Sequence, residues 1–316
     1  MKHALHAFTL IFALLVSCSL DASAATAPAR HTVTVEGHPV AVWSRVAARP
    51  EHAILLVHGR TWSTLTDFDL QPRGERRSVM RALQGARYAV YGIDLRGYGE
   101  TPRNADGWSL PNQSANDVAQ VLDWIHQRHP RLPKPALLGW SMGSMVAQLA
   151  AQCHPQALSD LILYGYPRDP GAPAVAPPTP AAPPREATTR ERALSDFISP
   201  QVTSQTVVEA FVGAALAHDP VRADWKQLEE YAALDGARVG APTLVIHGER
   251  DPLAPIAAQA RLFVSLGNPD KQWVVLAEGD HAAMLEDTHD AFIAAIRAFI
   301  ERPRLQSRSM QGRNSR

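Results

Sequence analysis

Short, almost continuously apolar segments recur along this chain. The first, AILLVHG at 53–59, is too short for a helix and is typical of a strand that is buried on both faces. The segment HTVTVEGHPVAVWSR alternates apolar and polar residues around Gly37, which predicts a two-stranded hairpin at a sheet edge. We expect further buried strands at 88–94, 135–140, 160–165, 242–248 and 272–279.

A helical spacing of apolar residues appears between these segments. Residues three and four positions apart are apolar at 116–128 and again at 287–302, so each segment is expected to form a helix with one buried face. Alternating strands and helices predict an α/β fold, with a mostly parallel sheet and helices on both of its faces. The 316 residues suffice for one large domain of this kind.

One segment interrupts the alternation. Residues 166–186 contain too many prolines for a helix or a central strand, and two helix-like stretches follow them. We therefore predict that an insertion covers the carboxyl edge of the sheet as a cap or lid. The predicted divisions are a signal peptide at 1–24, the first part of the core at 25–166, the cap at 167–237, the second part of the core at 238–301, and a disordered tail at 302–316.

The N-terminal residues have the order of a secretory signal. Lys2 precedes an apolar stretch at 8–16, and small residues at 22–24 fit a signal peptidase site that would leave Ala25 as the mature start. Leu-Val-Ser-Cys also resembles a bacterial lipobox, in which Cys18 would be lipidated and would anchor the protein to a membrane. We favour the secreted or periplasmic form, with the lipoprotein as the alternative.

Charge and metal-binding motifs narrow the function classes. Acidic and basic residues balance at 31 each, which argues against a nucleic-acid partner. No HExxH, CxxC or clustered carboxylate motif occurs, so we expect no metal and no cofactor, and nothing indicates an obligate protein partner. Cys153 falls in an apolar helical pattern and is expected to be a small core residue. His58 and His247 precede glycines at strand ends and are expected to shape loops.

The strongest chemical signature is a serine between two glycines. Gly139-Trp140-Ser141-Met142-Gly143 lies where a predicted buried strand ends and a predicted helix begins, which is the context of a nucleophile elbow. Such a turn pushes the serine into a rare backbone conformation and leaves no room for side chains at the glycines. The helix would aim the Met142 amide at the oxygen on which negative charge develops.

A nucleophilic serine needs a base and an acid, and both have candidates downstream. Asp251 follows the predicted strand 242–248, and His281 follows the next strand. Glu249 is the alternative acid and His289 the alternative base. The order serine, aspartate, histidine is the one expected for a nucleophile elbow on an open α/β sheet.

On these motifs, together with LLVHGR and DLRGYGE, the chain resembles the α/β-hydrolase superfamily over about 32–299. The resemblance implies a serine hydrolase with a variable cap, in which Ser141, His281 and Asp251 form the catalytic triad. It also implies that the amide of Arg60 supplies the second oxyanion contact beside Met142. The residue after His-Gly in this family is commonly apolar or glycine, so arginine departs from that pattern.

The expected reaction is hydrolysis of a small-molecule carboxylic ester through an acyl-enzyme. Trp62, Trp140 and Met284 are the candidate substrate contacts and suggest an apolar acyl or alcohol group. An aminopeptidase of the same fold is the alternative, with Glu229 and Glu230 as candidate ligands of a substrate amine. A binding protein without catalysis is the third possibility.

Overall fold

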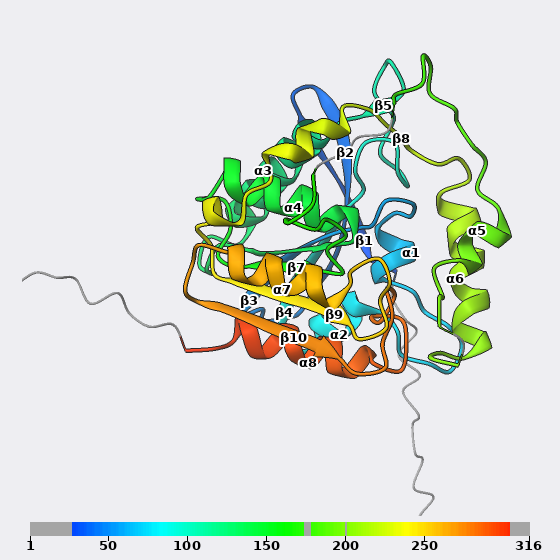
Figure 1. Cartoon of the computed structure of the whole chain (residues 1–316). Coiled ribbons are helices and arrows are strands. Elements are labelled where there is room, and N and C mark those ends of the chain that lie inside the picture. The colour runs from blue at the N-terminus through cyan, green and yellow to red at the C-terminus, as the bar shows by residue number, and fades with distance from the viewer. Residues whose placement is uncertain (1–26, 174–177, 200, 304–316) are drawn as a thin grey trace, which may run out of the picture.

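Eight strands form the central sheet of the computed structural model, which describes residues 27–173, 178–199 and 201–303 (Figure 1). Their spatial order is β1-β2-β4-β3-β6-β7-β9-β10. The strands are β1 (Ala29–Val35), β2 (His38–Val46), β3 (His52–Val57), β4 (Tyr88–Ile93), β6 (Ala136–Trp140), β7 (Leu161–Tyr164), β9 (Thr243–Gly248) and β10 (Lys271–Leu276).

The pairing confirms the α/β class predicted from the sequence. The six strands from β4 to β10 run parallel to one another. β1 and β2 form an edge hairpin in which Val35 pairs with His38, and β2 is also antiparallel to β4. Each apolar segment forms a strand, but β10 is only partly buried because it is the other edge of the sheet. The prediction of a fully buried strand was wrong there.

Helices cover both faces of the sheet and form two apolar cores (Figure 1). One core includes side chains of α3 (Pro111–Arg128), α4 (Met142–Cys153) and α7 (Ile256–Ser265). The other includes side chains of α1 (Thr64–Phe68), α2 (Val79–Gly85) and α8 (His289–Ile300). Both helical segments expected from the periodic apolar pattern thus form, as α3 and α8.

The segment 167–237, called the cap below, connects β7 to β9. It contains α5 (Arg190–Leu194), α6 (Gln205–His218), β8 (Asp224–Trp225) and the short 3-10 helix η1 (Leu228–Ala233), and a second 3-10 helix, η2 (Gly236–Arg238), extends one residue past its end. In Figure 1, α5 and α6 stand beside the sheet next to α1. The strand β8 pairs with β5 (Trp108–Ser109), which precedes α3.

Cys153 is exposed and free, so the expectation that it is a core residue was wrong. It is the last residue of α4 and projects away from the apolar face of that helix.

The predicted signal peptide, including Cys18, lies outside the described residues, as does most of the predicted tail. No helix in the described ranges is long and apolar enough to cross a membrane.

Candidate active site

Ser141 occupies a tight turn between β6 and α4. Its φ of 53° and ψ of −125° are rare for a residue with a side chain. A Cβ on Gly139 would lie 2.2 Å from the carbonyl oxygen of Gly143, and a Cβ on Gly143 would lie 2.2 Å from the carbonyl oxygen of His58. The two glycines therefore let strand, turn and helix pack closely enough to hold the serine in this conformation.

The turn places Ser141 at the N-terminus of α4 and in the wall of a pocket. Its backbone N–H donates to the carbonyl oxygen of Tyr164, 2.9 Å away on the neighbouring strand. Met142 is the first residue of the helix and lines the same pocket. The unpaired amides at the start of α4 can therefore stabilise negative charge that forms near Ser141.

His281 and Asp251 form a buried pair on two loops at the carboxyl edge of the sheet. The Nδ1 atom of His281 lies 2.8 Å from Asp251 Oδ2, and both residues are 3% exposed. The other carboxylate oxygen of Asp251 accepts the backbone N–H groups of Leu253 and Ala254 at 2.8 and 3.1 Å. These contacts fix the carboxylate, and the carboxylate in turn fixes the plane of the imidazole.

Side chains from β6 and β7 also hold the loop that carries His281 in place. The carbonyl oxygen of His281 accepts from Trp140 Nε1 and from the hydroxyl of Tyr164, each at 2.9 Å. His281 and Ser141 both line the pocket, although no hydrogen bond joins them in the described part of the chain. Catalytic hydrogen bonds are often long without substrate and shorten in the complex, so this separation suits a substrate-free site.

The alternative acid and base lie elsewhere. Glu249 is exposed, and its carboxylate accepts the backbone N–H of Glu278 at 2.9 Å instead of contacting His281. His289 begins α8, where its Nδ1 contacts the carbonyl oxygen of Met284 at 2.6 Å, and it does not line the pocket. Of the candidate residues, the structure therefore brings Asp251 and His281 together.

The loop after β3 carries Arg60 beside the serine. Buried His58 shapes this loop, because its Nδ1 contacts the Gly59 carbonyl oxygen at 2.8 Å and its Nε2 accepts the Leu95 N–H at 3.0 Å. Burial lowers the pKa of His58 to about 4, so the imidazole is neutral at neutral pH. The hydroxyl of Tyr98 donates to the carbonyl oxygen of Arg60 and fixes its backbone.

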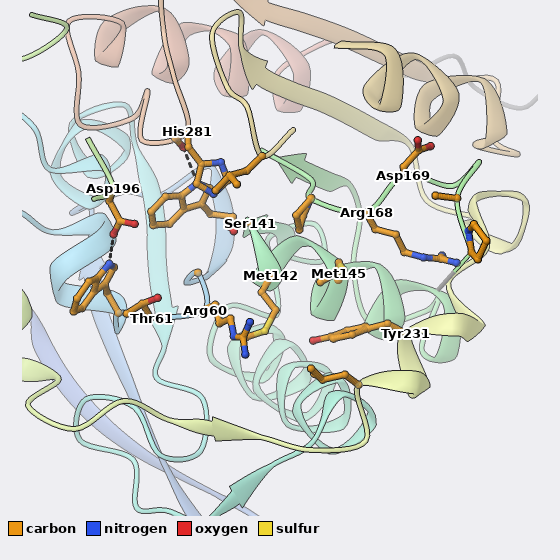
Figure 2. Close-up of a pocket in the computed structure, with 18 residues that line it drawn as sticks. Arg60, Thr61, Ser141, Met142, Met145, Arg168, Asp169, Asp196, Tyr231 and His281 are labelled. Carbon is orange, nitrogen blue, oxygen red and sulfur yellow. Dashed lines mark hydrogen bonds between the residues drawn. The ribbon is translucent and has the colours of Figure 1, made fainter. Parts of the chain in front are cut away.

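The pocket has a volume of about 710 Å³, within the range of small-molecule sites (Figure 2). Trp62 and Trp140 line it, as the sequence suggested. Met284 does not: it is fully buried in the core, because the chain turns inward after His281 and its backbone N–H donates to Tyr164. Apolar side chains in the wall include Met142, Met145, Leu228 and Leu253.

The sequence reasoning missed the cap residues that line the pocket, among them Asp196 and Tyr231. Asp196, just after α5, accepts a hydrogen bond from the indole N–H of Trp62. Burial raises the pKa of Asp196 to about 6, although the bond from Trp62 and the nearby His281 oppose this shift. Tyr231, on η1, also lines the pocket. Neither residue sits in a motif, and only the packing of the cap against the core brings them into one pocket with Ser141.

Asp196 and Arg60 occupy different parts of the wall, whereas Arg168 and Asp169 are neighbours in it. Figure 2 shows Asp196 on the side of His281, whereas Arg60 and Tyr231 lie beyond Met142. The described residues contain no group of three or more histidine, cysteine, aspartate or glutamate side chains that could hold a metal ion.

Comparison with known proteins identifies the family of this chain. A family model described as serine aminopeptidase, S33, matches residues 48–288. The pimeloyl-[acyl-carrier protein] methyl ester esterase of Chromobacterium violaceum is 28% identical over 231 residues, which are 68% of this chain and 85% of that protein. Serine hydrolase BPHL of Mus musculus is 28% identical over 220 residues, 65% of each chain.

Solved structures show the same fold. A serine hydrolase involved in carbazole degradation superposes with a TM-score of 0.63 at 16% identity, covering 87% of this chain and 99% of that chain. The family model spans about three quarters of the chain and includes the elbow, the His281 loop and the cap. The chain therefore belongs to the S33 serine aminopeptidase family and is a serine hydrolase of the α/β-hydrolase superfamily.

Proposed function

We propose that this protein hydrolyses carboxylic esters through an acyl-enzyme, with Ser141 as nucleophile, His281 as base and Asp251 as the acid that orients it. The observation that carries the proposal is the buried contact between His281 Nδ1 and Asp251, beside a serine held in a strained turn. This contact fixes the imidazole tautomer and leaves Nε2 to receive the serine proton. Binding of substrate would bring Nε2 within hydrogen-bond distance of the Ser141 hydroxyl.

The reaction then follows in two balanced steps. Ser141 Oγ attacks the ester carbonyl while its proton passes to His281, and the amides of Met142 and Arg60 stabilise the oxyanion. The C–O bond to the alcohol breaks, and His281 returns the proton to the departing alcohol. Water gives a proton to His281 and attacks the acyl carbon, the bond to Ser141 Oγ breaks, and His281 returns the proton to Ser141 Oγ as the acid is released.

The pocket and the named relatives support an ester of moderate size. Its volume of about 710 Å³ and the apolar side chains of Trp62, Trp140 and Met145 suit an acyl or alcohol group with several carbons. Both relatives named above are described as hydrolases, and one is described as a methyl ester esterase.

A panel of p-nitrophenyl esters of graded acyl length tests this proposal. We expect hydrolysis of several esters, with at least a thousandfold loss of kcat in the Ser141→Ala variant and little change in its stability. Hydrolysis that survives in the folded variant would contradict the assignment. Absence of turnover with every ester and amide tested would favour the non-catalytic binding protein.

An aminopeptidase is the second candidate, because the matching family model bears that description and a cap carboxylate lies in the pocket. Glu229 and Glu230 line no part of that pocket, and Glu230 accepts the backbone N–H of Asn112. Asp196 is the carboxylate placed to receive a substrate amine. Amino-acid p-nitroanilides in the same panel separate the two activities, and faster cleavage of anilides than esters would favour the peptidase.

We also propose that the protein is exported, on the strength of the sequence at 1–24. Intact mass of the protein from its native host tests this. A chain that begins at Ala25 supports a secreted or periplasmic enzyme, whereas a chain that begins at a lipidated Cys18 would identify a membrane-anchored lipoprotein. A full-length chain would contradict export by either route.

A further inference from the structure

Polar groups in the pocket differ in whether the protein already satisfies them. Asp196 accepts from Trp62, and Asp169, at the mouth, pairs with Arg261 at 2.6 Å. By contrast, the Tyr231 hydroxyl is buried and has no hydrogen-bond partner within the part of the chain that the structure describes. A buried hydroxyl without a partner is unfavourable, so a ligand group that accepts its proton would stabilise this wall of the pocket.

Tyr231 is held rigidly in this position. It is 6% exposed and lies on η1, whose end is fastened to α4 through the amide of Gln152. Gln152 donates to the carbonyl oxygen of Ala233 at 3.1 Å and accepts the N–H of Asp235 at 3.0 Å. Figure 2 shows the hydroxyl directed toward Met142 and Arg60. The backbone that carries this donor is therefore held in place, and the burial of the ring keeps the hydroxyl in the pocket wall.

Arg60 brings an uncompensated positive charge to the same wall. It is exposed, and its guanidinium makes no ion pair or hydrogen bond with any residue that the structure describes. Arg60 and Tyr231 line the same pocket, and both lie near Met142 in Figure 2. Burial raises the pKa of Tyr231, and the charge of Arg60 partly opposes that rise. The guanidinium of Arg60 offers donors that are always charged, and the unpartnered hydroxyl of Tyr231 offers one further donor.

We propose that Tyr231 and Arg60 form a subsite for a carboxylate carried by the substrate, so that the preferred substrates are hemiesters of dicarboxylic acids. Met142 and Met145 line the pocket between Ser141 and this subsite, which suits an apolar chain linking the reacting ester to the distant carboxylate (Figure 2). Guanidinium and phenol groups together bind a carboxylate through charge-assisted hydrogen bonds. This inference rests on the ester hydrolase activity proposed above.

The test compares p-nitrophenyl hemiesters of adipic and suberic acid with p-nitrophenyl heptanoate and nonanoate, neutral esters of similar length. We expect kcat/KM for a hemiester to exceed that for its neutral partner by at least about tenfold in the wild type. The Tyr231→Phe variant should lower this ratio about tenfold, and Arg60→Met should lower it and remove its dependence on salt. Tyr91→Phe is the matched control, because its hydroxyl contacts His129 away from the pocket, and it should leave the ratio unchanged.

Inhibition of the wild type by adipate and by hexanoate provides a second measurement that needs no variant. Stronger inhibition by adipate supports the subsite, and equal inhibition contradicts it. A wild-type ratio near one, or a ratio that folded Tyr231→Phe leaves unchanged, would also overturn the inference. Ser141-dependent hydrolysis of heptanoate would still stand in that case, so failure of the subsite is distinguishable from failure of the proposed function.

Discussion

The elbow around Ser141 and the cap contribute to the same pocket by different physical means. At the elbow the backbone itself is close-packed, so that a single added methyl group at Gly139 or Gly143 would meet a carbonyl oxygen at 2.2 Å. The cap begins with a proline-rich segment and contacts the core through the pairing of β8 with β5, the apolar side chains of α6, and hydrogen bonds of single side chains such as Asp196 and Asp219. The comparison suggests that the core fixes the chemistry, whereas the cap selects the substrate and can vary without loss of that chemistry.

The largest loss of activity should follow substitution of Asp251, the proposed catalytic acid in the core. Asp251→Asn should lower kcat about ten-thousandfold, because an amide cannot hold His281 in the tautomer that accepts the serine proton. Steady-state kinetics on a p-nitrophenyl ester measures this loss. Glu249→Gln is the control, since its carboxylate contacts Glu278, and it should change kcat little. A variant Asp251→Asn that keeps more than a tenth of the wild-type kcat would remove Asp251 from the mechanism.

Alanine substitutions at two glycines, one in the core and one in the cap, compare how closely the two regions are packed. Gly143→Ala should destabilise the protein by about 3 kcal/mol or more, because the new methyl group meets backbone atoms that cannot yield. Gly213→Ala, inside α6 of the cap, meets no atom within 4 Å and should stabilise the protein by up to about 1 kcal/mol. Chemical denaturation measures both values. Equal changes in the free energy of unfolding would contradict the proposed difference in packing between core and cap.

Lowering the pH should reduce the free energy of unfolding through His58, which lies in the loop that carries Arg60. The folded imidazole of His58, with a pKa of about 4, stays neutral at pH 5, whereas in the unfolded chain it is protonated below about 6.5. The unfolded state therefore binds more protons between these values, and His58 lowers the free energy of unfolding by up to about 3 kcal/mol as the pH falls from 6.5 to 4.

The variant His58→Gln isolates this contribution from the other titrating groups. It should be less stable than the wild type at pH 7, and the difference should shrink as the pH falls toward 4. Urea denaturation at several pH values measures the difference. A gap that stays constant with pH would show that His58 is not held neutral by the fold.

The smallest of these effects concerns the attachment of the cap. The carboxylate of Asp219 accepts from the N–H and hydroxyl of Ser63 and from the N–H of Gly99, at 2.8 to 3.0 Å. Asp219→Asn should lower the free energy of unfolding by about 2 kcal/mol, because its amide group would face a donor. Asp169→Asn, which loses only an exposed ion pair with Arg261, should change stability little. Identical thermal unfolding of the two variants would argue against this attachment.

The same contrast explains what could be predicted from the sequence. Gly139, Ser141 and Gly143 lie within five residues, so a local pattern contains the whole elbow. The sheet was predictable because each strand is a short apolar run between helical periods. The order of Asp251 and His281 after successive strands places them at one sheet edge, and the choice over Glu249 needed only the direction of a side chain.

Features that depend on long-range packing were not predictable. Tyr231 and Asp196 reach the pocket only because the cap packs against the core, and no local spacing marks either residue. Met284 was wrongly expected in the pocket because the sequence gives no indication that the chain turns into the core after His281. Cys153 was misplaced because the apolar pattern of α4 does not show where its last turn meets solvent.

Mass spectrometry after treatment with a fluorophosphonate tests the central claim, that the strained Ser141 is the nucleophile. We predict one adduct per native chain, located on the peptide that contains Ser141, and no adduct on the folded Ser141→Ala variant or on denatured wild-type protein. An adduct on another residue of the native protein, or labelling that persists in the Ser141→Ala variant, would contradict the account.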